Sequence, residues 1–160
     1  MLLKTILDED FNNYKIPSMF LATCFCTFKC SIELGLDPSI CQNEPIYHQP
    51  NIEVATDEIF RRYSENKITH AVVFGGMEPF LQFDEMLEVI KLFRSCGCND
   101  DICIYTGYNE SEIQHQIEVL SQFSNLTLKV GRFIPNQKPY YNELLGVKLA
   151  SPNQYAIKIS

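Results

Sequence analysis

The chain has 160 residues, of which 46% are apolar and 21% charged, a balance that excludes a disordered protein and predicts a single domain over residues 1–160. Thirteen Lys and Arg against twenty Asp and Glu give a net charge of −7 without any basic run, so neither nucleic acid nor a membrane surface is an expected partner. The first residues lack the apolar stretch of a signal peptide, and we expect a cytoplasmic protein. Thiols stay reduced there, so its seven cysteines indicate metal binding or catalysis rather than disulfides.

Strands and helices alternate in the predicted elements. An apolar run at 19–22 predicts a short buried strand, after which the cysteines begin a loop. Residues 31–51 contain three prolines and little periodicity, which predicts an irregular loop of a length that is commonly functional. Apolar periodicity and capping residues then predict, in chain order, a helix over 56–67, a strand over 70–74, a helix over 83–93, a strand over 102–105, a helix over 109–120, a strand over 126–130 and a terminal strand over 155–159.

This order of elements favours an α/β fold with a parallel sheet and right-handed crossovers. Ligands of such sheets bind beyond the carboxyl ends of the strands. The unusual residues of this chain all follow strands, namely the cysteine loop, the GGMEP segment at 75–79, Thr106 and the GRF segment at 131–133. The sequence therefore predicts a functional site at one edge of the sheet.

Four cysteines lie within 18 residues, at Cys24, Cys26, Cys30 and Cys41. The spacing of Cys26 and Cys30 suits two thiolates that bind different irons of one cluster. Cys41 is the best candidate for the third ligand and Cys24 is its competitor. Three cysteines on a cubane cluster leave one iron open to a substrate. The alternative is that all four hold a structural Zn²⁺, although the usual paired C-x2-C motifs are absent.

Three further cysteines, Cys96, Cys98 and Cys103, are expected at a helix end and in a strand. We interpret them as buried, inert thiols rather than as an accessory metal site.

The segment MFLATCFCTFKC at 19–30 resembles the strand and the first two cysteines of the small radical S-adenosylmethionine activases, above all the anaerobic ribonucleotide reductase activating proteins. The resemblance extends along almost the whole chain. The family's third cysteine position is occupied by Glu33, and Cys41 followed by Gln42 and Asn43 resembles the displaced end of the motif. The resemblance thus implies a variant C-x3-C-x10-C motif within a cluster-binding loop at 24–43.

Other segments carry the same resemblance. GGMEP is similar to the family turn that binds the amino group of the methionine moiety, and GRF followed by SPNQ at 151–154 is similar to the family's ending, although Val130 replaces a characteristic Asp. The resemblance implies cofactor binding by Gly75, Gly76, Met77, Glu78 and Pro79 in the turn and by Ile40 near adenine. By their positions after strands, Thr106 is a candidate for the ribose hydroxyls, and Lys129 and Arg132 are candidates for the carboxylate or ribose. The alternative is that Thr106 makes no ligand contact and that Lys129 and Arg132 are solvated charges.

The resemblance implies a fold, the parallel-sheet partial (open) βα barrel of radical S-adenosylmethionine enzymes. It also implies a 4Fe-4S cluster and S-adenosylmethionine as cofactors, and reductive cleavage to a 5′-deoxyadenosyl radical. The expected hydrogen donor is a glycine of a partner glycyl radical enzyme, and the expected electron donor is a flavodoxin or ferredoxin. Two alternatives stay open: a relative that acts on another protein or small molecule, and a non-catalytic zinc- or iron–sulfur-binding adaptor.

Overall fold

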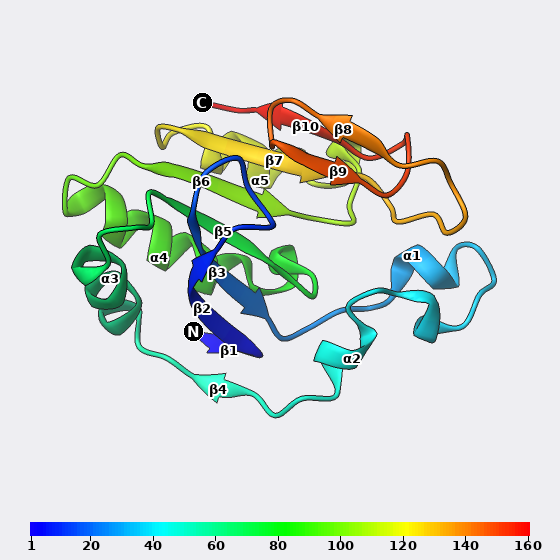
Figure 1. Cartoon of the computed structure of the whole chain (residues 1–160), viewed down its shortest axis with the longest axis horizontal. Helices are drawn as coiled ribbons and strands as arrows, with labels where there is room; N and C mark the ends of the chain where they lie inside the picture. Colours follow the sequence, from blue (N-terminus) through cyan, green and yellow to red (C-terminus); the bar gives the residue numbers. More distant parts are fainter.

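The computed structural model describes residues 1–160 and is built on a six-stranded sheet with the order β10-β7-β6-β5-β3-β2 (Figure 1). The four inner strands, which are mutually parallel, are β3 (Ser18–Thr23), β5 (Ala71–Gly76), β6 (Asp101–Tyr105) and β7 (Leu126–Val130). The edge strands β2 (Thr5–Asp10) and β10 (Tyr155–Lys158) are antiparallel to their neighbours. The four predicted inner strands and the terminal strand are confirmed.

The larger of the two cores lies between one face of the sheet and the helices. Every second residue of the inner strands, such as Leu21, Phe74 and Ile104, is buried in this core. The helices are α3 (Thr56–Glu65), α4 (Phe83–Ser95) and α5 (Gln114–Leu120), which confirms the three predicted helices. The third of them starts with a 3₁₀ turn, Glu110–Glu112, whose capping box joins Asn109 and Glu112 as the sequence predicts.

A smaller core covers the opposite face over the first half of the strands. Val73 and Cys103 pack there against Tyr14, Leu145 and Leu149. The hairpin of β8 (Tyr140–Asn142) and β9 (Val147–Leu149) supplies part of this cover. Because the hairpin packs on the first half of the strands, the carboxyl half of the same face is left to line a cavity.

The predicted irregular loop contains only short elements. It carries α1 (Lys29–Ile32), a 3₁₀ turn (Pro38–Ile40) and α2 (Glu44–Tyr47). It ends at β4 (Ile52–Glu53), which pairs with β1 (Leu2–Leu3). Figure 1 shows α1 and α2 at the end of the molecule opposite to α3. A long extended segment that contains β4 leads from α2 to α3. The loop is thus held at the end of the sheet where the parallel strands finish.

The sheet differs from a purely parallel one because β2 and β10 flank it in the antiparallel sense. The partial barrel implied by the resemblance stays a prediction, and the structure shows a mixed sheet with a parallel centre. None of the helices has both the length and the apolar character that crossing a membrane requires.

Candidate metal centre

A cavity of about 300 Å³ opens at the carboxyl ends of β3, β5, β6 and β7. Cys26, Cys30 and Cys41 all line it. Cys24 does not, because it is only 2% exposed and lies at the end of β3, where its backbone N–H donates to Gln82 Oε1 at 2.7 Å. The structure therefore brings together the three thiols that the spacing favours and leaves the competitor outside.

The backbone between the first two thiols is tightly turned. Phe28 has a left-handed conformation with φ 53°, which is uncommon for a residue other than glycine, and it redirects the chain into α1. Its backbone N–H donates to Cys26 Sγ at 3.2 Å. Cys30 is the second residue of α1 and so follows the turn directly. This local geometry lets both thiols reach the cavity from one short segment.

Burial raises the pKa of the Cys26 thiol to about 11, against the opposing effect of the Phe28 N–H. Burial also raises the pKa of Cys30, opposed by the backbone N–H of Phe133 and by the charges of Arg132 and Lys129. Both thiols are therefore protonated at neutral pH in the absence of metal. A metal that binds here must displace their protons.

Gly107 lies close to the Cys30 thiol and the Glu78 carboxylate. A Cβ at this position would lie 3.0 Å from Cys30 Sγ and 3.5 Å from Glu78 Oε2. A side chain at this position would therefore require the Cys30 thiol to shift, whereas its Cβ would be in ordinary contact with the Glu78 carboxylate. Sequence reasoning singled out its neighbour Thr106 and missed Gly107, although a glycine directly after a buried strand is a detectable signal.

Two hydrogen bonds tie the cysteine loop to the turn at 75–79. Asn43 Nδ2, two residues after Cys41, donates to the carbonyl of Gly76 at 2.6 Å. The backbone N–H of Glu78 donates to the carbonyl of Phe25 at 2.8 Å. Both ends of the loop are thus fixed against the same turn, which explains why thiols 15 residues apart in the sequence share one cavity.

Glu78 braces the ends of β5 and β6 through its side chain. Its carboxylate accepts bonds from Phe80 N at 3.1 Å, Thr106 Oγ1 at 2.8 Å and Gly107 N at 2.8 Å. Burial raises its pKa, while these bonds and the charge of Lys129 oppose the rise. Glu78 and Thr106 line the cavity, but the polar groups of both side chains already bind each other.

Lys129 is the cation of the cavity wall. It is 8% exposed, and its ammonium group makes one hydrogen bond, to the carbonyl of Gly131 at 3.3 Å. Burial lowers its pKa to about 8. An ammonium has three donors and costs free energy when it is buried without an anion. Lys129 is therefore suited to bind an anionic group of a ligand in the cavity.

Residues 19–150 of the chain match the model of a family described as a 4Fe-4S single cluster domain. The chain belongs to this family. No curated protein and no solved structure matches it. The match confirms the predicted 4Fe-4S cluster at the level of the family, and an iron–sulfur domain is compatible with an oxidoreductase.

The donor set of this 4Fe-4S domain fits a cluster. No three side chains of His, Cys, Asp or Glu converge on a position for a single metal ion. In a cubane cluster each thiolate binds its own iron, so the ligands surround a volume instead of a point. Three thiols on the wall of one cavity, Cys26, Cys30 and Cys41, provide such an arrangement.

The cavity of the 4Fe-4S domain is lined by nine of the residues that the sequence analysis selected, namely Cys26, Cys30, Cys41, Gly75, Gly76, Met77, Glu78, Thr106 and Lys129. Ile40, Pro79 and Arg132 lie outside its lining. Asn12, Asn13 and Tyr105 also line it and were not selected, because they come from a loop and a strand with no recognisable motif. Phe133 and Gln154 line it as well and belong to the GRF and SPNQ segments, from which only Arg132 was selected.

The remaining cysteines are apart from the cavity. Cys103 is fully buried in the smaller core, as expected for an inert thiol. Cys98 is half-buried and Cys96 is exposed, so the expectation of burial was wrong for Cys96. The reason is its position as the C-cap of α4, where the helix turns toward solvent.

Proposed function

We propose that this 4Fe-4S domain is a radical S-adenosylmethionine enzyme of the activase type. It would cleave S-adenosylmethionine reductively and take a hydrogen atom from a glycine of a partner glycyl radical enzyme such as an anaerobic ribonucleotide reductase. The observation that carries the proposal is that Cys26, Cys30 and Cys41 share one cavity with the turn at 75–79. A purely electron-carrying domain has no need of a ligand cavity beside its thiols.

Cys26, Cys30 and Cys41 would hold the cluster. Bound there, the cluster would supply the electron that cleaves the sulfonium and an iron open to the amino and carboxylate groups of S-adenosylmethionine. The remaining work belongs to the protein, which has to place the substrate and exclude water. A flavodoxin or ferredoxin is the proposed electron donor.

The turn at 75–79 would receive the amino group of the substrate. The Gly75 carbonyl accepts a bond from Thr23 Oγ1 at 3.0 Å and the Gly76 carbonyl accepts one from Asn43. A carbonyl oxygen has two lone pairs, and an ammonium group would bind beside these bonds. These bonds also fix the direction of both carbonyls before the substrate arrives, which lowers the entropic cost of binding.

Lys129 would pair with the substrate carboxylate. Its buried ammonium lies on the wall of the same cavity and has donors to spare. The cavity volume of about 300 Å³ is at the lower end of the range for small-molecule sites, about 300–1,000 Å³. The cluster and S-adenosylmethionine would share this cavity, and the hydrogen donor would reach it from outside.

The test is anaerobic reconstitution with iron and sulfide, followed by reduction in the presence of S-adenosylmethionine. We expect about four irons per chain and formation of 5′-deoxyadenosine. Cys41→Ser should lose the cluster, whereas Cys24→Ser is the matched control and should keep it. A wild-type protein with a full cluster but no 5′-deoxyadenosine would leave the adaptor alternative standing. Appearance of a glycyl radical signal on a co-incubated reductase would establish the activase type.

A further inference from the structure

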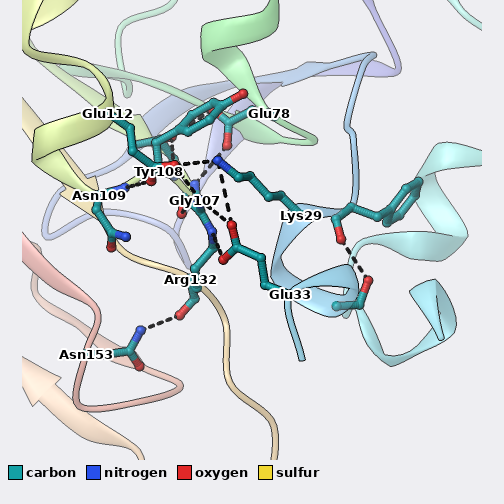
Figure 2. A network of polar contacts seen from close by, with 12 residues as sticks. Lys29, Glu33, Glu78, Gly107, Tyr108, Asn109, Glu112, Arg132 and Asn153 are labelled. Carbon is teal, nitrogen blue, oxygen red and sulfur yellow. Dashed lines mark hydrogen bonds and ion pairs between the residues drawn. The ribbon is translucent and has the colours of Figure 1, made fainter. Parts of the chain in front are cut away.

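A network of four charged side chains lies on the outer side of the cysteine loop (Figure 2). Arg132 Nε and Nη2 donate to the two carboxylate oxygens of Glu33 at 2.9 and 3.1 Å. Arg132 Nη2 also donates to Glu112 Oε1 at 2.7 Å, and Arg132 Nη1 donates to the carbonyl of Gly107. Lys29 binds Glu112 and lies 3.7 Å from Glu33. Two cations and two carboxylates therefore balance within the network.

The network reaches the thiols through α1. Lys29 and Glu33 are four residues apart and so lie on the same side of this helical turn, where they contact the network. Cys30, which lies between them in sequence, lines the cavity instead. The helical turn thus has one side on the cavity and another on the charged groups. Its position over the strand ends depends on both.

Contacts with residues other than Glu33 also fix the position of Arg132. Gly131 has φ +101°, and a Cβ there would lie 2.5 Å from the carbonyl oxygen of Asn153, so only glycine allows this approach. Asn153 Nδ2 in turn donates to the carbonyl of Arg132 at 2.7 Å, and the guanidinium lies 5.4 Å from the ring centroid of Tyr108. The side chain of Arg132 is 10% exposed. The arginine is a rigid part of the sheet end, and α1 docks onto it.

We propose that Arg132 is a positioning residue which, through Glu33 and Glu112, clamps α1 to the ends of β6 and β7 and thereby sets where Cys26 and Cys30 enter the cavity. The inference deepens the proposed function and rests on its assignment of these two thiols as cluster ligands. It also gives a role to Glu33, which occupies the position where the resemblance implies a third cysteine. Glu33 binds away from the cavity, so the third thiol comes from Cys41.

Arg132 lies close to the thiols of Cys26 and Cys30. A crevice of only about 20 Å³, enough for one water molecule, is lined by Cys26, Cys30, Gly107 and Arg132. Arg132 and the two thiols thus line one small space, so a shift of Arg132 or of α1 changes the surroundings of both thiols. The Arg132 side chain is 10% exposed and the Glu33 side chain 45%. The pair contributes less to stability than a buried one, but its bidentate geometry fixes the relative positions of the two side chains. Groups that orient metal ligands in this way typically change metal affinity about 10- to 100-fold when they are removed.

The test compares Arg132→Gln with Arg62→Gln. Arg62 also makes a bidentate pair, to Asp8 at 2.8 and 2.8 Å, on α3 and far from the cavity, so it is a matched control for the loss of a bound arginine. After reconstitution, the rate at which an iron chelator removes the cluster is measured without S-adenosylmethionine, together with the electron paramagnetic resonance spectrum of the reduced cluster. We expect release about 10- to 100-fold faster and an altered spectrum in Arg132→Gln, with the control unchanged.

Glu33→Gln provides a second variant, because Glu33 is half-exposed and its replacement leaves the core intact. We expect faster release in this variant as well, and a smaller effect of Arg132→Gln when it is combined with Glu33→Gln than in the wild type. Release and spectrum equal to wild type in Arg132→Gln, or equal acceleration in the Arg62 control, would overturn the inference. Neither readout involves cleavage of S-adenosylmethionine, so failure of the clamp and failure of the proposed function are distinguishable.

Discussion

Replacing Lys129 by methionine should stabilise the apoprotein while it weakens binding of an anionic ligand. Methionine fills similar space without a charge, and the position is buried. The charge is costly because burial lowers the pKa of Lys129 from 10.5 to about 8. Below pH 8 Lys129 is charged in the folded protein. The buried charge lowers the free energy of unfolding of the wild type relative to a protein with a neutral side chain at this position.

The size of the effect follows from the change in pKa. The difference of about 2.5 at about 1.4 kcal/mol for each pKa unit gives a ceiling of about 3.5 kcal/mol in the free energy of unfolding. The substitution also removes the Lys129 charge, which stabilises the Glu78 carboxylate, and this loss reduces the gain. Between pH 8 and 10.5 the unfolded state binds more protons than the folded state, so wild-type stability rises with pH. The advantage of Lys129→Met is therefore complete below pH 8 and disappears above pH 10.5.

The assay is urea unfolding of the reduced apoprotein at several values between pH 6 and 10.5, with wild type and Lys129→Met side by side. Thiols and tyrosines that Lys129 does not influence contribute equally to both proteins and cancel in the difference, whereas Cys30, whose pKa the Lys129 charge lowers, contributes a difference of its own. Binding of S-adenosylmethionine to the reconstituted, unreduced protein should weaken at least about tenfold, which corresponds to one charged hydrogen bond. A variant less stable than wild type at pH 7, or a difference that does not change with pH, would refute the reasoning.

Three further substitutions test the hydrogen bonds of the Glu78 carboxylate and the close packing at Gly107 and Gly76. Glu78→Gln turns an amide N–H₂ toward one of the donors, such as the N–H of Gly107, and should cost about 1–3 kcal/mol in urea unfolding; unchanged stability would show that the carboxylate is not needed. Gly107→Ala brings a Cβ to 3.0 Å from Cys30 Sγ, so the protein should fold but bind less iron than wild type, and full iron content would contradict this. Gly76→Ala combines φ +78° with a Cβ 2.8 Å from that of Ala22, and a loss of about 3 kcal/mol is expected; a loss below about 1 kcal/mol would refute the close packing.

The inner sheet could be predicted because its strands are short apolar runs buried on both faces. The edge strand β2 was missed, since its sequence TILDED ends in acidic residues and lacks the pattern of a buried strand. Its side chains are stabilised from outside the strand, as in the bidentate pair of Asp8 with Arg62. Such a pairing over 54 residues leaves no local pattern in the sequence.

The spacing of Cys26, Cys30 and Cys41 singles them out as candidate ligands, and the structure adds the cavity that all three line. The role of Arg132 could not be predicted, because an arginine after a strand is equally consistent with a ligand contact, a solvated charge or an internal ion pair. Its partners Glu33 and Glu112 are 99 and 20 residues away in sequence. Only the folded chain shows that the guanidinium is already occupied.

The contact between Arg132 and Glu33 also has a consequence for the order of events during biosynthesis. The two residues are 99 positions apart, and translation at roughly 5–20 residues per second needs about 5–20 s to span them. During this interval the thiols of the nascent chain have emerged without the wall that later encloses them. On the proposed assignment of Cys26 and Cys30 as ligands, the cavity that would hold the cluster is complete only after Arg132 has been translated.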